Sequence, residues 1–134
     1  MKDARSALMP LSVIFAVLLL PQFYLAGAAT FGATSFDAHV GLGYALLALS
    51  LALVVVAVAS RTLVALTALL LGLMVLQVVL AQAGEGSGWI GGLHAVNALA
   101  IFAVAGLIGH RAGMRAKGLG EPEPTRRFDR PPAG

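Results

Sequence analysis

Two histidines stand at matching places in this sequence, and both are residues that can bind a metal ion. His39 follows Gln22 by 17 residues, and His94 follows Gln77 by the same interval. The two stretches share the pattern Q-x-x-L-A-x-A and are offset by 55 residues without a gap. Because Gln and His are rare in this chain, their shared spacing indicates that two helical hairpins repeat one design.

A neutral imidazole is a standard axial ligand of haem iron, and the core of a helix bundle is a common place for such a site. If both histidines begin diagonal helices at one depth, they face each other across the bundle axis. We therefore predict that His39 and His94 are the axial ligands of one haem b. The predicted supporting residues, which leave room for the porphyrin edge or fix the imidazole tautomers, are Gly43, Asn97, Gln22 and Gln77. Further polar side chains expected at this depth are Tyr24, Tyr44 and Gln82.

Other interpretations of the two histidines stay open. A histidine within one turn of the membrane surface costs little free energy and needs no ligand. A quinol-type ligand, a proton path or another metal are further alternatives. For zinc, two histidines without a nearby carboxylate are too few ligands. Asp37 precedes His39 by two residues, but nothing equivalent precedes His94.

The elements that must position these residues are four apolar segments, each close to the roughly 20 residues that a membrane-spanning helix needs. The predicted spans cover residues 7–28, 38–59, 62–83 and 90–110. Only Ser60 and Arg61 separate the second span from the third, so these two spans form an antiparallel hairpin. The predicted fold is an all-α, four-transmembrane-helix up-down bundle built of two repeated hairpins, in which spans two and four are diagonal.

The basic residues predict the direction of the chain through the membrane. Lys2 and Arg5 precede the first span, Arg61 lies between the second and third, and the other six follow the fourth. All nine therefore fall on one side, which places both termini in the cytoplasm of a bacterial cell, with the protein in its inner membrane. Residues 111–134 are a basic, proline-rich tail that we expect to be disordered and close to anionic lipid head groups. Ala26-Gly27-Ala28 resembles a signal-peptide cleavage site, but the repeat favours retention of the first span.

The composition excludes several classes of protein. Hydrophobic residues make up 59% of the chain and charged residues 11%, against about 25% charged in soluble domains. A water-soluble globule, a disordered chain and a nucleic-acid-binding module are therefore excluded. The chain has no cysteine, so disulfides, thiolate-bound iron–sulfur clusters and thiol catalysis are excluded too. The sequence also contains no nucleophile–base pair, phosphate-binding loop or paired intramembrane carboxylates.

Two short motifs carry a resemblance to known families. His39-Val40-Gly41-Leu42-Gly43 and His94-Ala95-Val96-Asn97-Ala98 resemble the starts of spans two and four in one half of haem A synthase and in small bis-histidine membrane b-type cytochromes. Together with residues 22–28 and 37–39, the second motif is still more similar to an uncharacterised family of four-span actinobacterial membrane proteins, over about residues 8–110. The closer family brings no established activity.

The resemblance to the synthase implies haem ligation by His39 and His94. This chain is half the length of the synthase, and Asp37 is offset by one residue from the usual spacing of the synthase's acidic residue. These departures favour electron transfer, or a haem-bearing accessory subunit, over haem A synthesis and over a stand-alone enzyme.

The predicted function is electron transfer within the membrane by one b-type haem near the outer leaflet. The first alternative is a haem-free accessory or scaffold subunit of a larger membrane complex, such as a respiratory complex. The second is a quinone- or lipid-binding protein that uses the same polar residues. The expected partners are the lipid bilayer and such a complex, homo-oligomers remain open, and nucleic acid is not expected.

Overall fold

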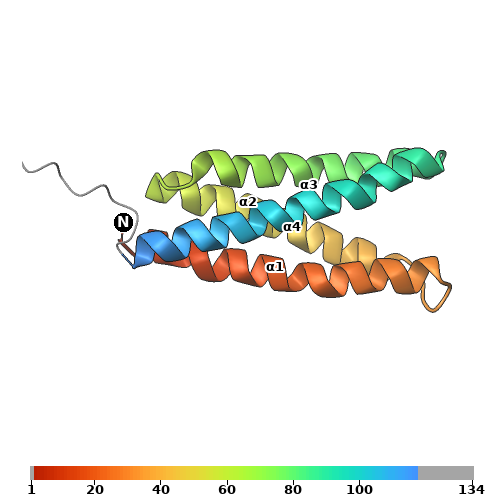
Figure 1. Ribbon diagram of the computed structural model, residues 1–134, viewed down its shortest axis with the longest axis horizontal. Helices are drawn as coiled ribbons and strands as arrows, with labels where there is room; N and C mark the ends of the chain where they lie inside the picture. Colours follow the sequence, from red (N-terminus) through yellow and green to blue (C-terminus); the bar gives the residue numbers. More distant parts are fainter. Residues whose placement is uncertain (1, 118–134) are drawn as a thin grey trace, which may run out of the picture.

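A computed structural model describes residues 2–117, which form four helices joined by short turns (Figure 1). The helices are α1 (Lys2–Thr30), α2 (Asp37–Ser60), α3 (Val64–Gly84) and α4 (Gly88–Ala116). Each predicted span lies within one helix, except that the third span was predicted to begin at residue 62 and α3 begins at Val64. Helix α4 continues past the predicted boundary at residue 110. The remainder of the predicted tail, residues 118–134, lies outside the described residues.

All four helices are long and apolar enough to cross a membrane, so the chain is a multi-pass membrane protein. Large apolar side chains cover the outside of the bundle, among them Val17, Val55, Val79 and Leu99. Such a surface would be unusual on a protein in water, but it is what a helix presents to lipid.

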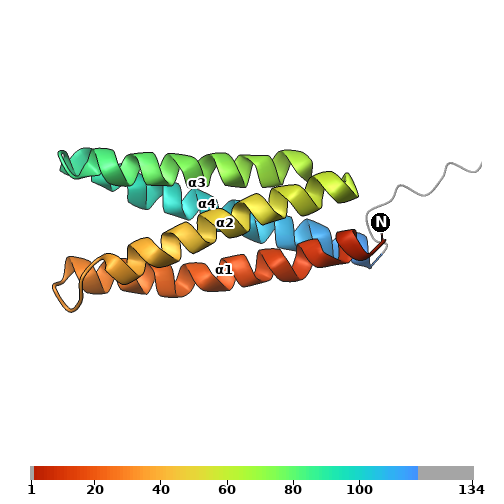
Figure 2. The ribbon, with the colours of Figure 1, turned by 180° about the vertical axis from the view of Figure 1, so that it is seen from behind.

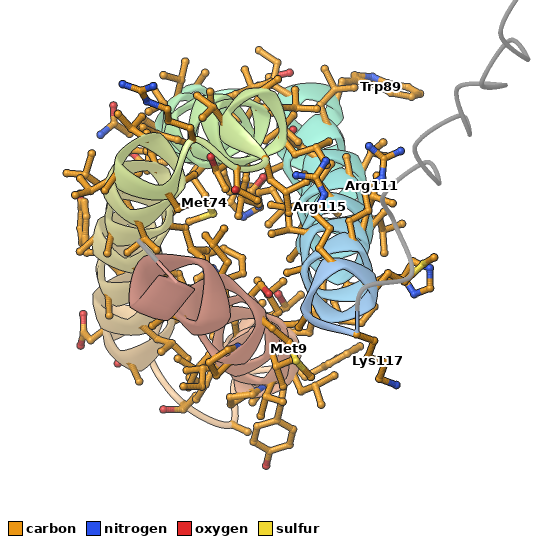
Figure 3. All side chains as sticks on the ribbon, turned by 90° about the vertical axis from the view of Figure 1, so that its left-hand side faces the viewer. Met9, Met74, Trp89, Arg111, Arg115 and Lys117 are labelled. Carbon is orange, nitrogen blue, oxygen red and sulfur yellow. The ribbon has the colours of Figure 1, made fainter. Side chains whose placement is uncertain are left out.

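The helices run in alternating directions (Figures 1 and 2), and a view along the bundle shows them around a common axis (Figure 3). Helix α1 packs against α2 and α4, and helix α3 packs against the same two helices. Over the described residues, no close backbone contact joins α1 to α3 or α2 to α4. The prediction that spans two and four are diagonal is therefore confirmed. The turn from α2 to α3 is tight because Arg61 and Leu63 both adopt left-handed backbone conformations, with φ of 51° and 57°.

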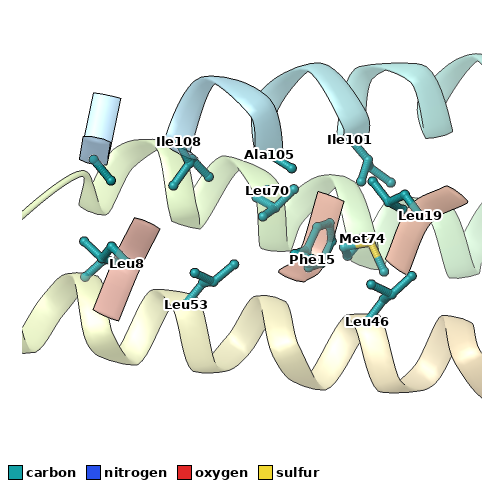
Figure 4. Close-up of a cluster of buried hydrophobic side chains, with 12 residues drawn as sticks. Leu8, Phe15, Leu19, Leu46, Leu53, Leu70, Met74, Ile101, Ala105 and Ile108 are labelled. Carbon is teal, nitrogen blue, oxygen red and sulfur yellow. The ribbon is translucent and has the colours of Figure 1, made fainter. Parts of the chain in front are cut away.

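Large apolar side chains fill the bundle axis along most of its length (Figure 4). Leu8 and Phe15, Leu46 and Leu53, and Ile101 and Ile108 are each seven residues apart, so they lie on the inner face of their helix two turns from each other. Figure 3, a view along the axis, shows Met74 pointing inward and Trp89 pointing outward. The four helices thus share one continuous apolar core.

The two ends of the bundle differ in charge. The beginning of α1, the α2–α3 turn and the end of α4 lie at one end (Figure 1). That end, which we call the basic end, carries Arg61, Arg111, Arg115 and Lys117, the last three of which are labelled in Figure 3. Asp37 and Glu85 lie at the opposite end, where α2 and α4 begin.

Two glycines close the hairpin of α3 and α4. A Cβ atom at Gly84 would lie 3.0 Å from Cα and 3.1 Å from N of Gly91, so the two backbones touch there. Because backbone atoms cannot turn aside, Gly84→Ala should lower the free energy of unfolding by about 1–3 kcal/mol. Gly72→Ala, in the same helix, is the matched control because nothing lies within 4 Å of its added Cβ. Unfolding in detergent followed by circular dichroism measures both, and equal responses would contradict this contact.

Candidate functional site

Five polar side chains gather inside the bundle at the end opposite the basic end. We call them the polar cluster, and its members are Gln22 on α1, His39 on α2, Gln77 on α3, and His94 and Asn97 on α4. Asn97 is buried, and the other four are partly buried. One helical turn further along the axis, the apolar core begins with Leu19, Met74 and Ile101. The cluster therefore forms a polar layer at one end of an apolar interior.

The two histidine rings lie next to each other across the bundle axis. Their ring centres are 6.2 Å apart, and their planes meet at 61°. This proximity joins the diagonal helices α2 and α4, whose backbones make no close contact with each other in the described residues. The structure thus brings together the two histidines that the sequence singled out. Phe36 packs edgewise on His39, with ring centres 6.1 Å apart.

Both histidines make the same bond to the helix that precedes them. Nδ1 of His39 lies 3.1 Å from the backbone oxygen of Gln22, and Nδ1 of His94 lies 3.0 Å from that of Gln77. A carbonyl oxygen only accepts hydrogen bonds, so each Nδ1 carries the proton and donates it. The lone pair of each neutral imidazole is therefore on Nε2. The acceptors for these imidazoles are the backbone carbonyls of the two glutamines rather than their side chains.

The side chain of Gln77 belongs to a chain of hydrogen bonds whose direction is fixed. Nδ2 of Asn97 donates to the backbone oxygen of Leu73 at 2.9 Å and to Oε1 of Gln77 at 2.6 Å. Nε2 of Gln77 then lies 3.0 Å from Nε2 of His94 and donates to its lone pair. Turning over the Asn97 amide would set its oxygen against the oxygens of Leu73 and Gln77, and turning over the Gln77 amide would set NH2 against NH2 and its oxygen against the lone pair of His94.

The side chain of Gln22 is placed differently. Its Nε2 donates to the backbone oxygen of His39 at 2.9 Å, and its Oε1 is buried with no partner in the described part of the chain. A Cβ atom on Gly43 would lie 3.2 Å from Nε2 of Gln22. Gly43, predicted to admit a porphyrin edge, here makes room for the Gln22 amide.

The two hairpins therefore differ where their sequences differ. The 55-residue offset aligns Asn97 with Leu42, which has no polar group to offer Gln22. The aligned sequence shows this difference. It does not show that the Gln22 and Gln77 side chains consequently donate to different acceptors. Across residues 2–117, Nε2 of His39 also makes no hydrogen bond, in contrast to Nε2 of His94.

Several polar residues expected at this depth do not join the cluster. Tyr24 and Tyr44 are 74% and 54% exposed, and Gln82 is exposed as well. Asp37 is exposed and accepts a hydrogen bond from the Ser35 hydroxyl at 2.8 Å. Within the described range, no three His, Cys, Asp or Glu residues come together to hold a metal ion. Of these four residue types, the polar cluster contains only His39 and His94.

Part of the chain matches the model of a known protein family. The chain is similar over residues 22–84 to a family of unknown function (DUF6220), a match that covers just under half of its length. The matched region begins at Gln22 and includes His39 and Gln77. No curated protein and no solved structure matches the chain significantly.

Proposed function

We propose that the polar cluster holds one haem b, with His39 and His94 as its axial ligands, and that the protein transfers electrons within the membrane. The observation that carries this proposal is the pair of imidazoles 6.2 Å apart on opposite sides of the bundle axis. Two imidazoles on opposite sides of one metal ion, each with its nitrogen about 2 Å from it, have ring centres roughly 6 Å apart. A porphyrin supplies its own four nitrogens, so no third protein ligand is required.

The hydrogen bonds at Nδ1 of both histidines fit this ligand. Histidines that bind a metal through one nitrogen generally donate the other N–H to a carbonyl or carboxylate, which fixes the tautomer. His39 and His94 both do so, through the backbone oxygens of Gln22 and Gln77. The buried, unpartnered Oε1 of Gln22 further indicates that the cluster alone leaves a polar group unsatisfied.

The chain's own residues would hold, orient and shield the cofactor, and bound haem would supply one-electron redox chemistry. Both imidazoles are oriented by backbone atoms of helices, which are rigid supports. The apolar core beneath the cluster, from Leu19, Met74 and Ile101, excludes water from that side. This arrangement is suited to an electron carrier or a haem-bearing accessory subunit.

The proposal includes a direction in the membrane. With the basic end in the cytoplasm of a bacterial cell, the positive-inside rule places the polar cluster near the outer leaflet of the inner membrane. The exposed arginines and lysine of the basic end would then contact anionic lipid head groups. In this proposal the two hairpins are copies of one helix–turn–helix unit, each contributing one axial histidine.

A reduced-minus-oxidised absorption spectrum of the purified protein, expressed with added haem, tests the proposal. The wild type should show the sharp bands of a low-spin b-type cytochrome, and His39→Ala and His94→Ala should each lose them. His110→Ala is the matched control, because His110 is exposed near the basic end. A folded but colourless wild type would overturn the haem proposal and favour a haem-free accessory subunit or a quinone- or lipid-binding protein.

A further inference from the structure

We infer that the two histidines have unequal roles, because Gln77 caps the Nε2 of His94 while the Nε2 of His39 is open. His39 would therefore be available as the first ligand of a haem iron, and His94 would become available only after the Gln77 side chain has turned away. Gln77 is thus a positioning residue that controls the second ligation step. The order of ligation rests on the proposed haem function, whereas the cap itself does not.

The cap follows from the single lone pair of a neutral imidazole. With Nδ1 of His94 donating to the Gln77 carbonyl, Nε2 has one lone pair, and the Gln77 amide donates to it at 3.0 Å. The same lone pair cannot accept this hydrogen and bind iron at once. Asn97 strengthens the cap because its Nδ2 holds Oε1 of Gln77 at 2.6 Å and so fixes the direction of the amide.

The equivalent cap is missing from the first hairpin for two reasons. The Gln22 amide donates instead to the backbone oxygen of His39, into space that Gly43 leaves free. Leu42 stands where the second hairpin has Asn97, so no side chain there can hold the Gln22 amide in the capping direction. The lone pair on Nε2 of His39 is therefore available without any side-chain movement.

Carbethoxylation with diethyl pyrocarbonate tests the cap without haem, since this reagent modifies the free lone pair of neutral imidazoles. Mass spectrometry of the haem-free protein in detergent should show His39 modified about fivefold faster than His94, the factor expected for one hydrogen bond. Both rings are partly buried, so the effect of removing the Gln77 amide, rather than the wild-type ratio alone, separates the cap from differences in access. Gln77→Met should bring the His94 rate close to that of His39.

Two further variants keep this test decisive. Gln82→Met, an exposed glutamine on the same helix, is the matched control and should leave both rates unchanged. Asn97→Ala should raise the His94 rate to an intermediate value, because the cap then loses its support. All variants are compared at temperatures where circular dichroism shows them folded. Equal rates for His39 and His94 in the wild type, or no effect of Gln77→Met, would overturn the cap.

Stopped-flow mixing of hemin with the haem-free protein tests the order of ligation. The wild type should show a first phase that depends on hemin concentration and gives a high-spin spectrum. A second, concentration-independent phase should then give the low-spin spectrum. Gln77→Met should accelerate only the second phase, by about fivefold. A single phase in the wild type would overturn the order. A wild type with no low-spin spectrum would overturn the proposed function, while the carbethoxylation result would still decide the cap.

Discussion

Replacing Gln77 with leucine should lower the free energy of unfolding of the haem-free protein by about 2 kcal/mol, whereas Gln22→Leu should change it by less than about 0.5 kcal/mol. The two glutamines occupy equivalent places in their hairpins, so burial and depth are nearly matched. They differ in what their side chains satisfy. Loss of the Gln77 amide leaves Nε2 of His94 without its donor and one hydrogen of Asn97 without its acceptor.

Loss of the Gln22 amide has a smaller effect because two of its consequences oppose each other. The variant removes one bond to the backbone oxygen of His39, but it also removes the buried Oε1 that has no partner among the described residues. Reversible unfolding in mixed detergent and dodecyl sulfate, followed by circular dichroism, measures both variants. Equal destabilisation would contradict the hydrogen-bond chain described for Gln77.

A double-mutant cycle locates the effect more closely. If the bond between Asn97 and Gln77 contributes as described, Asn97→Ala and Gln77→Leu together should destabilise less than the sum of the two single variants. The expected coupling is about 1 kcal/mol, near the upper part of the range for hydrogen bonds between membrane helices. Additive effects would indicate that the two amides act independently.

Much of the fold could be predicted from the sequence for a simple physical reason. An apolar segment of helix length has few ways to satisfy its backbone in lipid, so four such segments with short turns become an up-down bundle. Diagonal placement of spans two and four then follows from connectivity. The rotation of each helix about its own axis was harder to predict, since helices that are apolar all round carry little amphipathic signal. Tyr24 and Tyr44 therefore face outward although their depth matches that of the cluster.

The members of the polar cluster were predictable, but the atoms that they use were not. Rare Gln and His residues at equal spacing pointed to the same end of the bundle, and the structure places all of them there. The spacing does not show that the backbone oxygens of Gln22 and Gln77 accept the imidazole protons. It also does not show that Gly43 accommodates the Gln22 side chain, because that depends on the exact distance between α1 and α2 at this point.

Helix α1 packs against α4, and near the basic end the two helices leave little room at one glycine of α4. A Cβ atom on Gly109 would lie 3.2 Å from Oγ and 3.9 Å from Cβ of Ser12, which is fully buried. Toward the other end of the same interface, Phe23 packs edgewise on Phe102, with ring centres 6.5 Å apart. A large side chain at position 109 would therefore force α4 away from α1 along the stretch that ends in the polar cluster.

Gly109→Leu should consequently lower the free energy of unfolding by about 3 kcal/mol, the upper part of the range for overpacked cores. Gly106→Leu places the same side chain three residues away on the same helix, where nothing lies within 4 Å of the added Cβ, and should be tolerated. Unfolding by dodecyl sulfate measures both variants, and similar stabilities would contradict the described approach of α1 and α4.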